Sequence, residues 1–302
     1  ELQRLGEPVR GKVRDVYDLG DRLLIVTTDR ISAFDVVLGT VPLKGQVLNT
    51  IAAWQFEQTA DIVPNHVLAR PDPAAMLVRK LRPLPVELVV RRFITGSLWR
   101  AYENGERNLY GLSLPDGLRK DQRFEEPIIT PTTKADQGEH DKPLSPSEVV
   151  ERGLVPERAW NRLCELSIEL FKRGEQLARE RDLLLVDTKY EFALDPRTGE
   201  PVLIDEVHTP DSSRYWEASE YEARFERGEP QLMLDKENMR QWLLERGFSG
   251  DGRPPPLTDE VRVSLGLTYA RLQQRLCGEP PEIDPRPAAE RLEQNLRKAG
   301  II

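Results

Sequence analysis

The sequence has only two cysteines and three histidines among its 302 residues. Cys164 and Cys277 stand far apart, so they support neither a disulfide framework nor a cysteine-based zinc site. Three histidines likewise argue against a histidine-rich metal site. Cys164 falls in a helical pattern of apolar residues and is expected to be a small buried hydrophobe. The scarcity of cysteine indicates a reducing compartment, and we expect a cytoplasmic protein.

Long apolar runs are also missing. No stretch approaches the roughly 20 residues of a membrane span, and the first residues lack the apolar core of a signal peptide. The GxSxG, HExxH and kinase-loop motifs are absent too. A net charge of -8 argues against a nucleic-acid partner, which needs a basic face. A local site for a small anion stays open, and Arg91, Arg92 and Arg214 could supply it.

The pattern of apolar residues predicts strands first, then mixed elements, then helices, which is typical of an α+β fold. Apolar spacing and turn or cap signals predict the elements. They are a hairpin over 12–27, a helix over 45–63, a strand over 86–93, a short helix over 97–104, a helix over 156–182, strands over 183–194 and 202–207, and a helical tail from Asp235. The short helix is expected to have Ser97 as its N-cap and to end at Gly105.

Residues 109–146 are dense in Gly, Pro, Asp and Thr, and we expect an irregular, functional loop there. Ser145 to Glu148 form a capping box with Pro146 at the first helical position. In the tail, Asp235 and Thr258 are expected N-caps.

One hairpin carries the first candidate site. Asp187, Lys189 and Glu191 are spaced by two and therefore share one face of a strand. Asp205 follows on the returning strand. Two converging carboxylates, completed by water and phosphate oxygens, suit Mg²⁺. The alternative is a surface hairpin with a solvated polar face, but the apolar residues that lead into both strands argue against it.

The metal site depends on the hairpin's register. A loop over Pro196–Glu200 places Glu191 opposite Asp205, with Glu206 pointing away. A loop one residue longer pairs Glu191 with Ile204 and turns Asp205 to the other face. We expect the first register.

Three other segments could bind anions. Lys12 and Arg14 share a strand face after Gly11, although an exposed basic edge strand explains them equally well. Arg91 to Ser97 combine arginine, glycine and a helix start. In 210–214, Asp211 and Ser212 stand beside Arg214, which suits a phosphate or carboxylate but is also common turn chemistry.

Six segments together resemble the SAICAR synthetase family, from about Gly11 to about Trp242. They are GKVRDVY, TTDRISAFDV, VVRRFITGSLW, TPTTKADQGEHD, DTKYEFAL and LIDEVHTPDSSRYW. The resemblance implies an α+β fold with a smaller N-terminal β-rich lobe (1–93), a larger lobe (94–302), and a kinase-like or ATP-grasp-like nucleotide cleft between them. It also implies an ATP-dependent ligase that joins L-aspartate to carboxyaminoimidazole ribonucleotide.

The resemblance further implies roles for individual residues. Glu191 and Asp205 would bind magnesium, and Lys12 and Arg14 the ATP phosphates. The remaining residues are implied as follows: Lys189 and Asp187 near the transferred phosphoryl group; Arg91, Ser97 and Arg214 at the ribonucleotide phosphate; Asp211 and Ser212 at the substrate pocket; Lys80, Leu81 and Glu87 near adenine; Lys134 and His140 at aspartate or imidazole.

The expected partners are small molecules, with no nucleic acid or membrane, and the protein is expected to be a monomer or homodimer. Some family members lack the long loop and the C-terminal extension, so the resemblance does not fix the oligomeric state. Two alternatives stay open. One is an ATP-dependent small-molecule phosphotransferase on a similar cleft, and the other is a nucleotide-binding regulatory module without catalysis.

Overall fold

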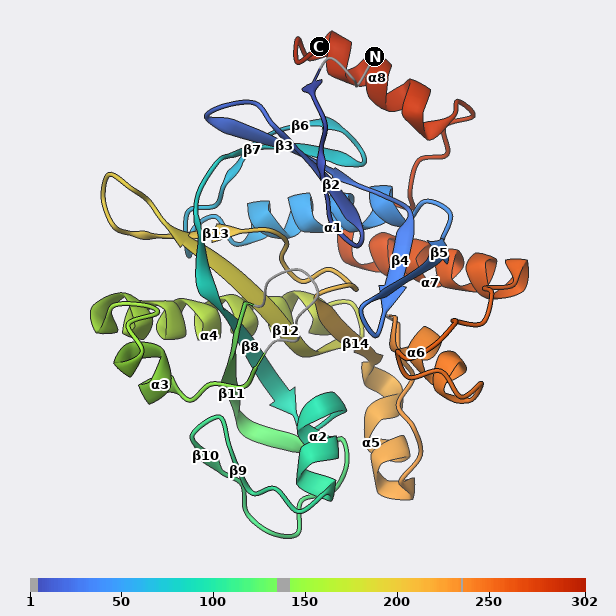
Figure 1. Cartoon of the computed structure of the whole chain (residues 1–302). Coiled ribbons are helices and arrows are strands. Elements are labelled where there is room, and N and C mark those ends of the chain that lie inside the picture. Colours follow the sequence, from blue (N-terminus) through green and yellow to red (C-terminus); the bar gives the residue numbers. More distant parts are fainter. Residues whose placement is uncertain (1–4, 135–141, 235) are drawn as a thin grey trace.

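The structure is a computed structural model that describes residues 5–134, 142–234 and 236–302. Its first sheet is antiparallel and has the strand order β1-β2-β3-β7-β6 (Figure 1). The bounds are β1 (Val9–Arg10), β2 (Arg14–Asp18), β3 (Arg22–Thr27), β6 (Val67–Asp72) and β7 (Ala75–Arg79). The expected first hairpin is β2–β3. A ribbon of β4 (Arg30–Ala33) and β5 (Val36–Thr40) follows it, and α1 (Lys44–Gln58) contacts β3, β6 and β7.

The second sheet has the order β11-β8-β12-β13, and β14 also pairs with β12. Its strands are β8 (Pro83–Phe93), β11 (Arg123–Thr133), β12 (Leu183–Leu194), β13 (Pro201–Ile204) and β14 (Ser213–Glu217). A short ribbon joins β9 (Asn108–Leu109) and β10 (Leu112–Ser113). The mixed composition of helix and sheet confirms the α+β prediction.

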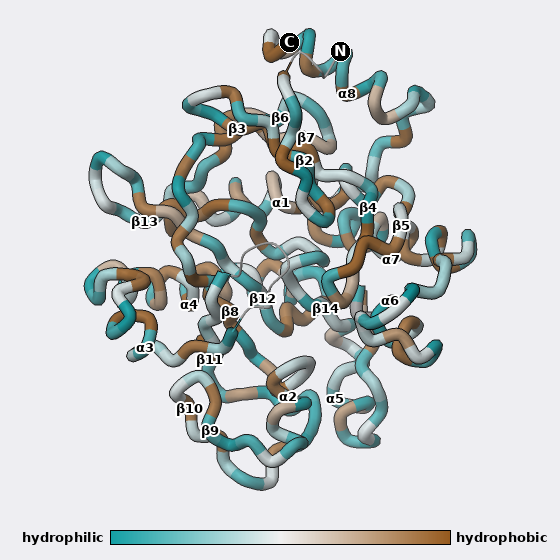
Figure 2. The backbone as a smooth tube through the Cα atoms, in the orientation of Figure 1, coloured by the Kyte–Doolittle hydropathy of each residue, from teal (hydrophilic) through white to brown (hydrophobic). Residues whose placement is uncertain are grey.

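The remaining helices surround the sheets (Figure 1). They are α2 (Gly96–Glu103), α3 (Pro146–Glu151), α4 (Glu157–Arg179), α5 (Ala218–Arg227), α6 (Glu237–Leu244), α7 (Asp259–Cys277) and α8 (Ala288–Lys298). Helix α4 packs on β12 and β8, α7 packs on α1, and α8 packs on β6. Figure 2 shows hydrophilic and hydrophobic residues interspersed along the helices, and no described helix is long and apolar enough to cross a membrane.

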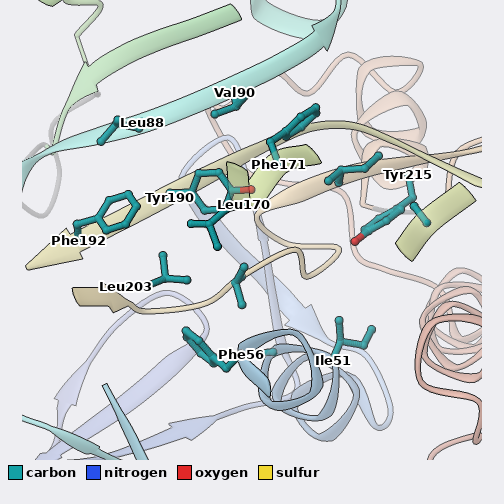
Figure 3. Close-up of a cluster of buried hydrophobic side chains, with 14 of the residues drawn as sticks. Ile51, Phe56, Leu88, Val90, Leu170, Phe171, Tyr190, Phe192, Leu203 and Tyr215 are labelled. Atoms are coloured by element: carbon teal, nitrogen blue, oxygen red, sulfur yellow. The ribbon is translucent and has the colours of Figure 1, made fainter. Parts of the chain in front are cut away.

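One buried cluster connects the two sheets. Figure 3 shows Tyr190 and Phe192 of β12 facing Leu170 of α4, with Phe56 of α1 close to Leu203. These apolar side chains are almost fully removed from water, and burial of this kind is the main favourable contribution to folding. The core therefore ties the second sheet to α1 beneath the first sheet.

The division at residue 93 stays a prediction. Because β8 is hydrogen-bonded to β11 and β12, the sheet topology favours a boundary between β7 and β8 instead.

Several local predictions hold. Ser145 accepts from the backbone N–H of Glu148, whose side chain accepts from the backbone of Ser145, so the capping box is confirmed. Thr258 caps α7 as expected, whereas Asp235 lies outside the described residues. Cys164 is only partly buried, although its apolar surroundings raise its pKa to about 12.

Two local predictions are wrong. Residues 109–146 are not wholly irregular, because they contain the eleven-residue strand β11. Its prolines Pro127 and Pro131 obscure it in the sequence, yet β11 is the outer strand of the sheet order, where a missing N–H is tolerated.

Helix α2 has Thr95 rather than Ser97 at its N-cap position, and no side chain caps it. The hydroxyl of Ser97 instead accepts a hydrogen bond from Arg91 (3.4 Å).

A buried ion pair fastens α8 to the first sheet. Asp72 accepts two hydrogen bonds of 3.1 Å from Arg291 and one of 2.7 Å from Asn295. We predict that Arg291→Met lowers the free energy of unfolding by about 3–5 kcal/mol, because it leaves the Asp72 carboxylate buried without its cation. Denaturant titration measures this.

The matched control is Arg162→Met, which removes an exposed ion pair with Glu165 on α4. It should cost less than about 1 kcal/mol. Equal effects of the two substitutions would contradict a special contribution from the buried pair.

Candidate active site

The charged face of the second sheet follows from strand alternation. Glu191 of β12 pairs with Glu87 of β8, and Asp187 pairs with Arg91. Since side chains alternate between faces, these four share one face with Lys189. The residues between them face α4 and the core (Figure 3). The same two strands therefore form both the core and the site.

Lys189 lies between two carboxylates. Its Nζ is 2.6 Å from Glu87 and 2.5 Å from Glu191, and Lys134 forms a second ion pair with Glu191. Burial alone raises the pKa of Glu191, but Lys189 and Lys134 outweigh it and hold that pKa well below its usual range. Burial lowers the pKa of Lys189, and Glu191 and Glu87 outweigh it and raise that pKa. This end of the face is therefore a charged cluster at neutral pH.

The predicted hairpin register is wrong. Glu191 pairs with Ile204 rather than Asp205. Asp205 nevertheless lies close enough to Glu191 for their charges to interact. The reason is that β13 ends at Ile204, and Asp205 adopts a left-handed backbone with φ of 69°. The alternation that would turn its side chain away does not continue past the strand end.

Arg14 bridges β2 to the end of β13. It forms ion pairs with Asp205 and with Glu206, so the expectation that Glu206 points away is also wrong. Thr209 donates a hydrogen bond to Glu206. Burial raises the pKa of Asp205 to about 6; Arg14 opposes that rise, and Glu191 and Glu206 add to it. Two neighbouring carboxylates thus share one arginine.

At the other end of the face, Asp187 accepts from two arginines. Arg91 donates to it at 3.1 Å and Arg214 forms a second ion pair. Arg91 also donates to Thr130 of β11 (2.9 Å). Gly96, at the start of α2, has φ of 56°, and a Cβ there would lie 2.5 Å from the Arg214 guanidinium. The absence of a side chain at Gly96 leaves room for Arg214.

Asp211 follows the hairpin and pairs with a lysine that the sequence analysis missed. Lys44, at the start of α1, donates to Asp211 at 2.7 Å, and its side chain is fully buried. Tyr269 of α7 donates to the same carboxylate at 3.3 Å. Burial raises the pKa of Asp211, but Lys44 outweighs it and holds that pKa below its usual range. The only sequence signal was a lysine at the start of a largely apolar helix. Ser212 contacts Thr209 and Ser213.

A buried histidine holds the segment that carries Asp205 and Asp211. His208 forms hydrogen bonds with Tyr190 of β12 (2.5 Å) and Gln55 of α1 (3.0 Å). Gly174 of α4 lies so close that a Cβ there would be 2.4 Å from the His208 ring. His208 thereby fixes the segment against three elements.

The structure leaves some predicted residues outside this cluster. Lys12 pairs with Asp35 and Lys80 pairs with Asp18, and both lysines are exposed. Leu81 packs against apolar residues of β12 and β13. His140 lies outside the described residues. Within the described ranges, no group of three or more acidic, histidine or cysteine side chains could hold a metal ion.

A model of the SAICAR synthetase family matches residues 7–254. The chain belongs to the SAICAR synthetase family. It is 47% identical over 291 residues to the phosphoribosylaminoimidazole-succinocarboxamide synthase of Bacteroides thetaiotaomicron, covering 95% of this chain and 92% of that protein. The synthase of Legionella pneumophila is 44% identical over 300 residues, covering 97% and 95%.

A solved structure of the same family agrees with this fold. SAICAR synthase from Saccharomyces cerevisiae, complexed with SAICAR, aligns with a TM-score of 0.81 and 33% identity. The alignment covers 93% of this chain and 97% of the yeast chain. The α+β fold class and the family expected from the sequence are therefore confirmed.

The buried contacts of His208 predict a pH effect on stability. Burial lowers the pKa of His208 from 6.5 to about 3, so the unfolded chain binds more protons between these values. The contribution of His208 to stability is complete above about pH 6.5 and falls as the pH drops toward 3, by up to about 1.4 kcal/mol per pH unit. His208→Gln should therefore be less stable at pH 7, and its deficit should shrink as the pH falls.

Denaturant titrations between pH 7 and pH 4 measure this difference. Tyr190→Phe is the control, because it removes one partner of His208 and keeps the titrating ring. Its deficit should stay nearly constant with pH. A constant deficit for His208→Gln would contradict the assignment of a buried neutral histidine.

Proposed function

We propose that this chain joins the amino group of L-aspartate to the carboxylate of carboxyaminoimidazole ribonucleotide, with cleavage of ATP to ADP and phosphate. One observation carries the proposal. The charged face of β8 and β12 lies in a chain that is 47% identical, over 95% of its length, to a relative named for this synthase. The product, SAICAR, is an intermediate of purine biosynthesis. We further propose a cytoplasmic enzyme that acts on small molecules as a monomer or homodimer.

The chemistry needs two transfers. A carboxylate oxygen of the ribonucleotide attacks the γ-phosphorus of ATP, and the bond to the β–γ bridging oxygen breaks to release ADP. The amine of aspartate then attacks the acyl carbon, phosphate leaves with the C–O electrons, and the nitrogen loses a proton. Such transfers require positioning and charge stabilisation rather than covalent help from the protein. Fixed cations and hydrogen bonds on two rigid strands provide both.

ATP is proposed to bind beside the first sheet. Lys12 and Arg14 flank the start of β2, where they can contact phosphates. The Lys12 side chain is 45% exposed and therefore accessible. Lys80, Leu81 and Glu87 are the proposed adenine neighbours. Lys80 and Leu81 lie in the connection between β7 and β8, and Glu87 lies on β8, so the nucleotide would lie across the junction of the two sheets.

The carboxylates at one end of the charged face are the kind of ligand that Mg²⁺ prefers. Glu191 and Asp205 offer hard carboxylate oxygens and interact electrostatically. Two protein carboxylates are enough for magnesium when phosphates and water complete the shell. Bound there, the ion would neutralise phosphate charge during transfer. We propose Glu191 and Asp205 as its ligands, and Lys189 as a neighbouring cation that contacts the transferred group.

The ribonucleotide is proposed to bind at the arginine end. Arg91 and Arg214 can form paired hydrogen bonds to a phosphate, and the Ser97 hydroxyl lies within reach of Arg91. Asp187 orients both arginines. Asp211 and Ser212 border the pocket. Lys134, together with His140, is proposed to contact aspartate or the imidazole.

The two alternatives give different products. A phosphotransferase would consume ATP without aspartate and leave a phosphorylated product, and a regulatory module would not turn ATP over. Measuring ADP and phosphate release with each substrate omitted in turn separates these cases. The ligase requires aspartate and the ribonucleotide together. Phosphorylated product in the absence of aspartate would refute it.

We predict that Glu191→Gln removes metal-dependent ATP binding and lowers kcat by about 10²–10³-fold, because one charge of the metal site is lost. Calorimetry with and without Mg²⁺, together with phosphate release, measures both effects. Glu165→Gln, an exposed change on α4, is the control and should behave like the wild type. Full activity in Glu191→Gln would sink the metal assignment.

Arg214→Ala should mainly raise the KM for the ribonucleotide, by roughly 10–100-fold, since a charge-assisted hydrogen bond is lost. Steady-state kinetics with each substrate varied measures this. Arg162→Ala, on the exposed face of α4, is the matched control. An effect confined to the KM for ATP would contradict the assignment of Arg214 to the ribonucleotide.

A further inference from the structure

A second group of charges adjoins the proposed site, around Asp211. The Lys44–Asp211 ion pair joins α1 to the segment between β13 and β14, and Tyr269 adds a bond from α7. Because the Lys44 side chain is fully buried, it cannot reach a ligand itself. The ion pair is instead a fixed group of charges that another side chain can pack against.

Backbone contacts place Lys236 near the Lys44–Asp211 pair. The N–H of Leu234 donates to the carbonyl of Tyr215 at 2.9 Å, and Met233 forms an isolated bridge with Trp216. Lys236 lies two residues after Leu234 and is the N-cap residue of α6. Its carbonyl accepts hydrogen bonds from the N–H groups of Met239 and Arg240. The position of Lys236 is therefore set by β14, which starts two residues after Asp211.

Lys236 is a partly enclosed cation without a partner. Within 5–134, 142–234 and 236–302, its side-chain ammonium group forms no hydrogen bond or ion pair, and its side chain is partly exposed. Burial lowers the pKa of Lys236, and the charges of Arg240 and Lys44 lower it further, against an opposing effect of Asp211 and Glu206.

The two nearby acids are engaged elsewhere. Asp211 accepts from Lys44 and Tyr269, and Glu206 pairs with Arg14 and accepts from Thr209. A buried charge is costly unless it is paired. An anion that enters beside Lys236 would supply the missing counter-charge.

We propose that Lys236, beside the Lys44–Asp211 pair, binds a carboxylate of the amino acid that the enzyme ligates. This inference rests on the proposed function and specifies its third substrate. The phosphates of ATP and of the ribonucleotide have proposed cations at Lys12, Arg14, Arg91 and Arg214. Lys134 is proposed to contact aspartate or the imidazole, but a dicarboxylate amino acid has two carboxylates to bind. Lys236 provides a further cation, and the segment 211–214 connects this position to Arg214.

The test compares Lys236→Met with wild type and with Lys236→Arg. The wild type is first shown to release phosphate only with aspartate, ribonucleotide and ATP together, so that failure of the proposed function is detected separately. Lys236→Met should then raise the KM for aspartate by about 10–100-fold, the usual effect of losing a hydrogen bond to a charged group. The KM values for ATP and the ribonucleotide should change less than about threefold, and Lys236→Arg should recover most of the affinity.

Lys172→Met, which removes an exposed lysine paired with Glu126 on the outer surface, is the matched control and should keep all three KM values. Thermal unfolding of each variant excludes a general loss of structure. An unchanged KM for aspartate in Lys236→Met would overturn the proposal. So would a rise confined to ATP or to the ribonucleotide, because it would assign Lys236 to a phosphate instead.

Discussion

The antiparallel pairing of β8 with β12 is the constraint on which the rest of the structure depends. Its register places Glu87 beside Glu191 and Arg91 beside Asp187, and alternation sends the intervening apolar residues toward α4. A slip of one residue in either strand would move charged side chains into the core and apolar ones into the site. Core packing and site geometry are therefore specified by the same hydrogen-bond ladder.

The segment after β13 contains left-handed backbone conformations that a regular strand does not have. Asp205 and His208 both adopt left-handed backbone conformations, with φ of 69° and 51°. Such conformations are costly for residues other than glycine, so surrounding contacts must hold them. The His208 ring supplies contacts to β12 and α1, and Arg14 draws Asp205 and Glu206 toward β2. The bent backbone lets two consecutive acidic residues reach one arginine, which alternating strand geometry forbids.

Sequence patterns predicted the parts governed by local periodicity. α4 was found because its apolar residues repeat with the helix period, β12 because it begins with a short apolar run, and the capping box at Ser145 is a local signal. β11 was missed because its tolerance of proline depends on its place at the sheet edge. The register of Glu191 failed because one residue of loop length decides it. Lys44 was missed because its partner, Asp211, lies 167 residues away, so no local pattern connects them.

The spacing along β12 is consistent with the proposed binding of two distant groups of one substrate by a single strand. Asp187 and Glu191 are four residues apart, which at about 3.3 Å per residue separates them by about 13 Å. In a ribonucleotide, the phosphate and the substituent on the base lie at opposite ends of the molecule. In the proposed binding mode, the arginines at one end of the strand therefore hold the phosphate, while Lys189 and the carboxylates at the other end contact the reacting carboxylate and the nucleotide. Because both ends belong to one hydrogen-bonded strand, their separation varies little, and the strand itself sets the distance over which the substrate must extend.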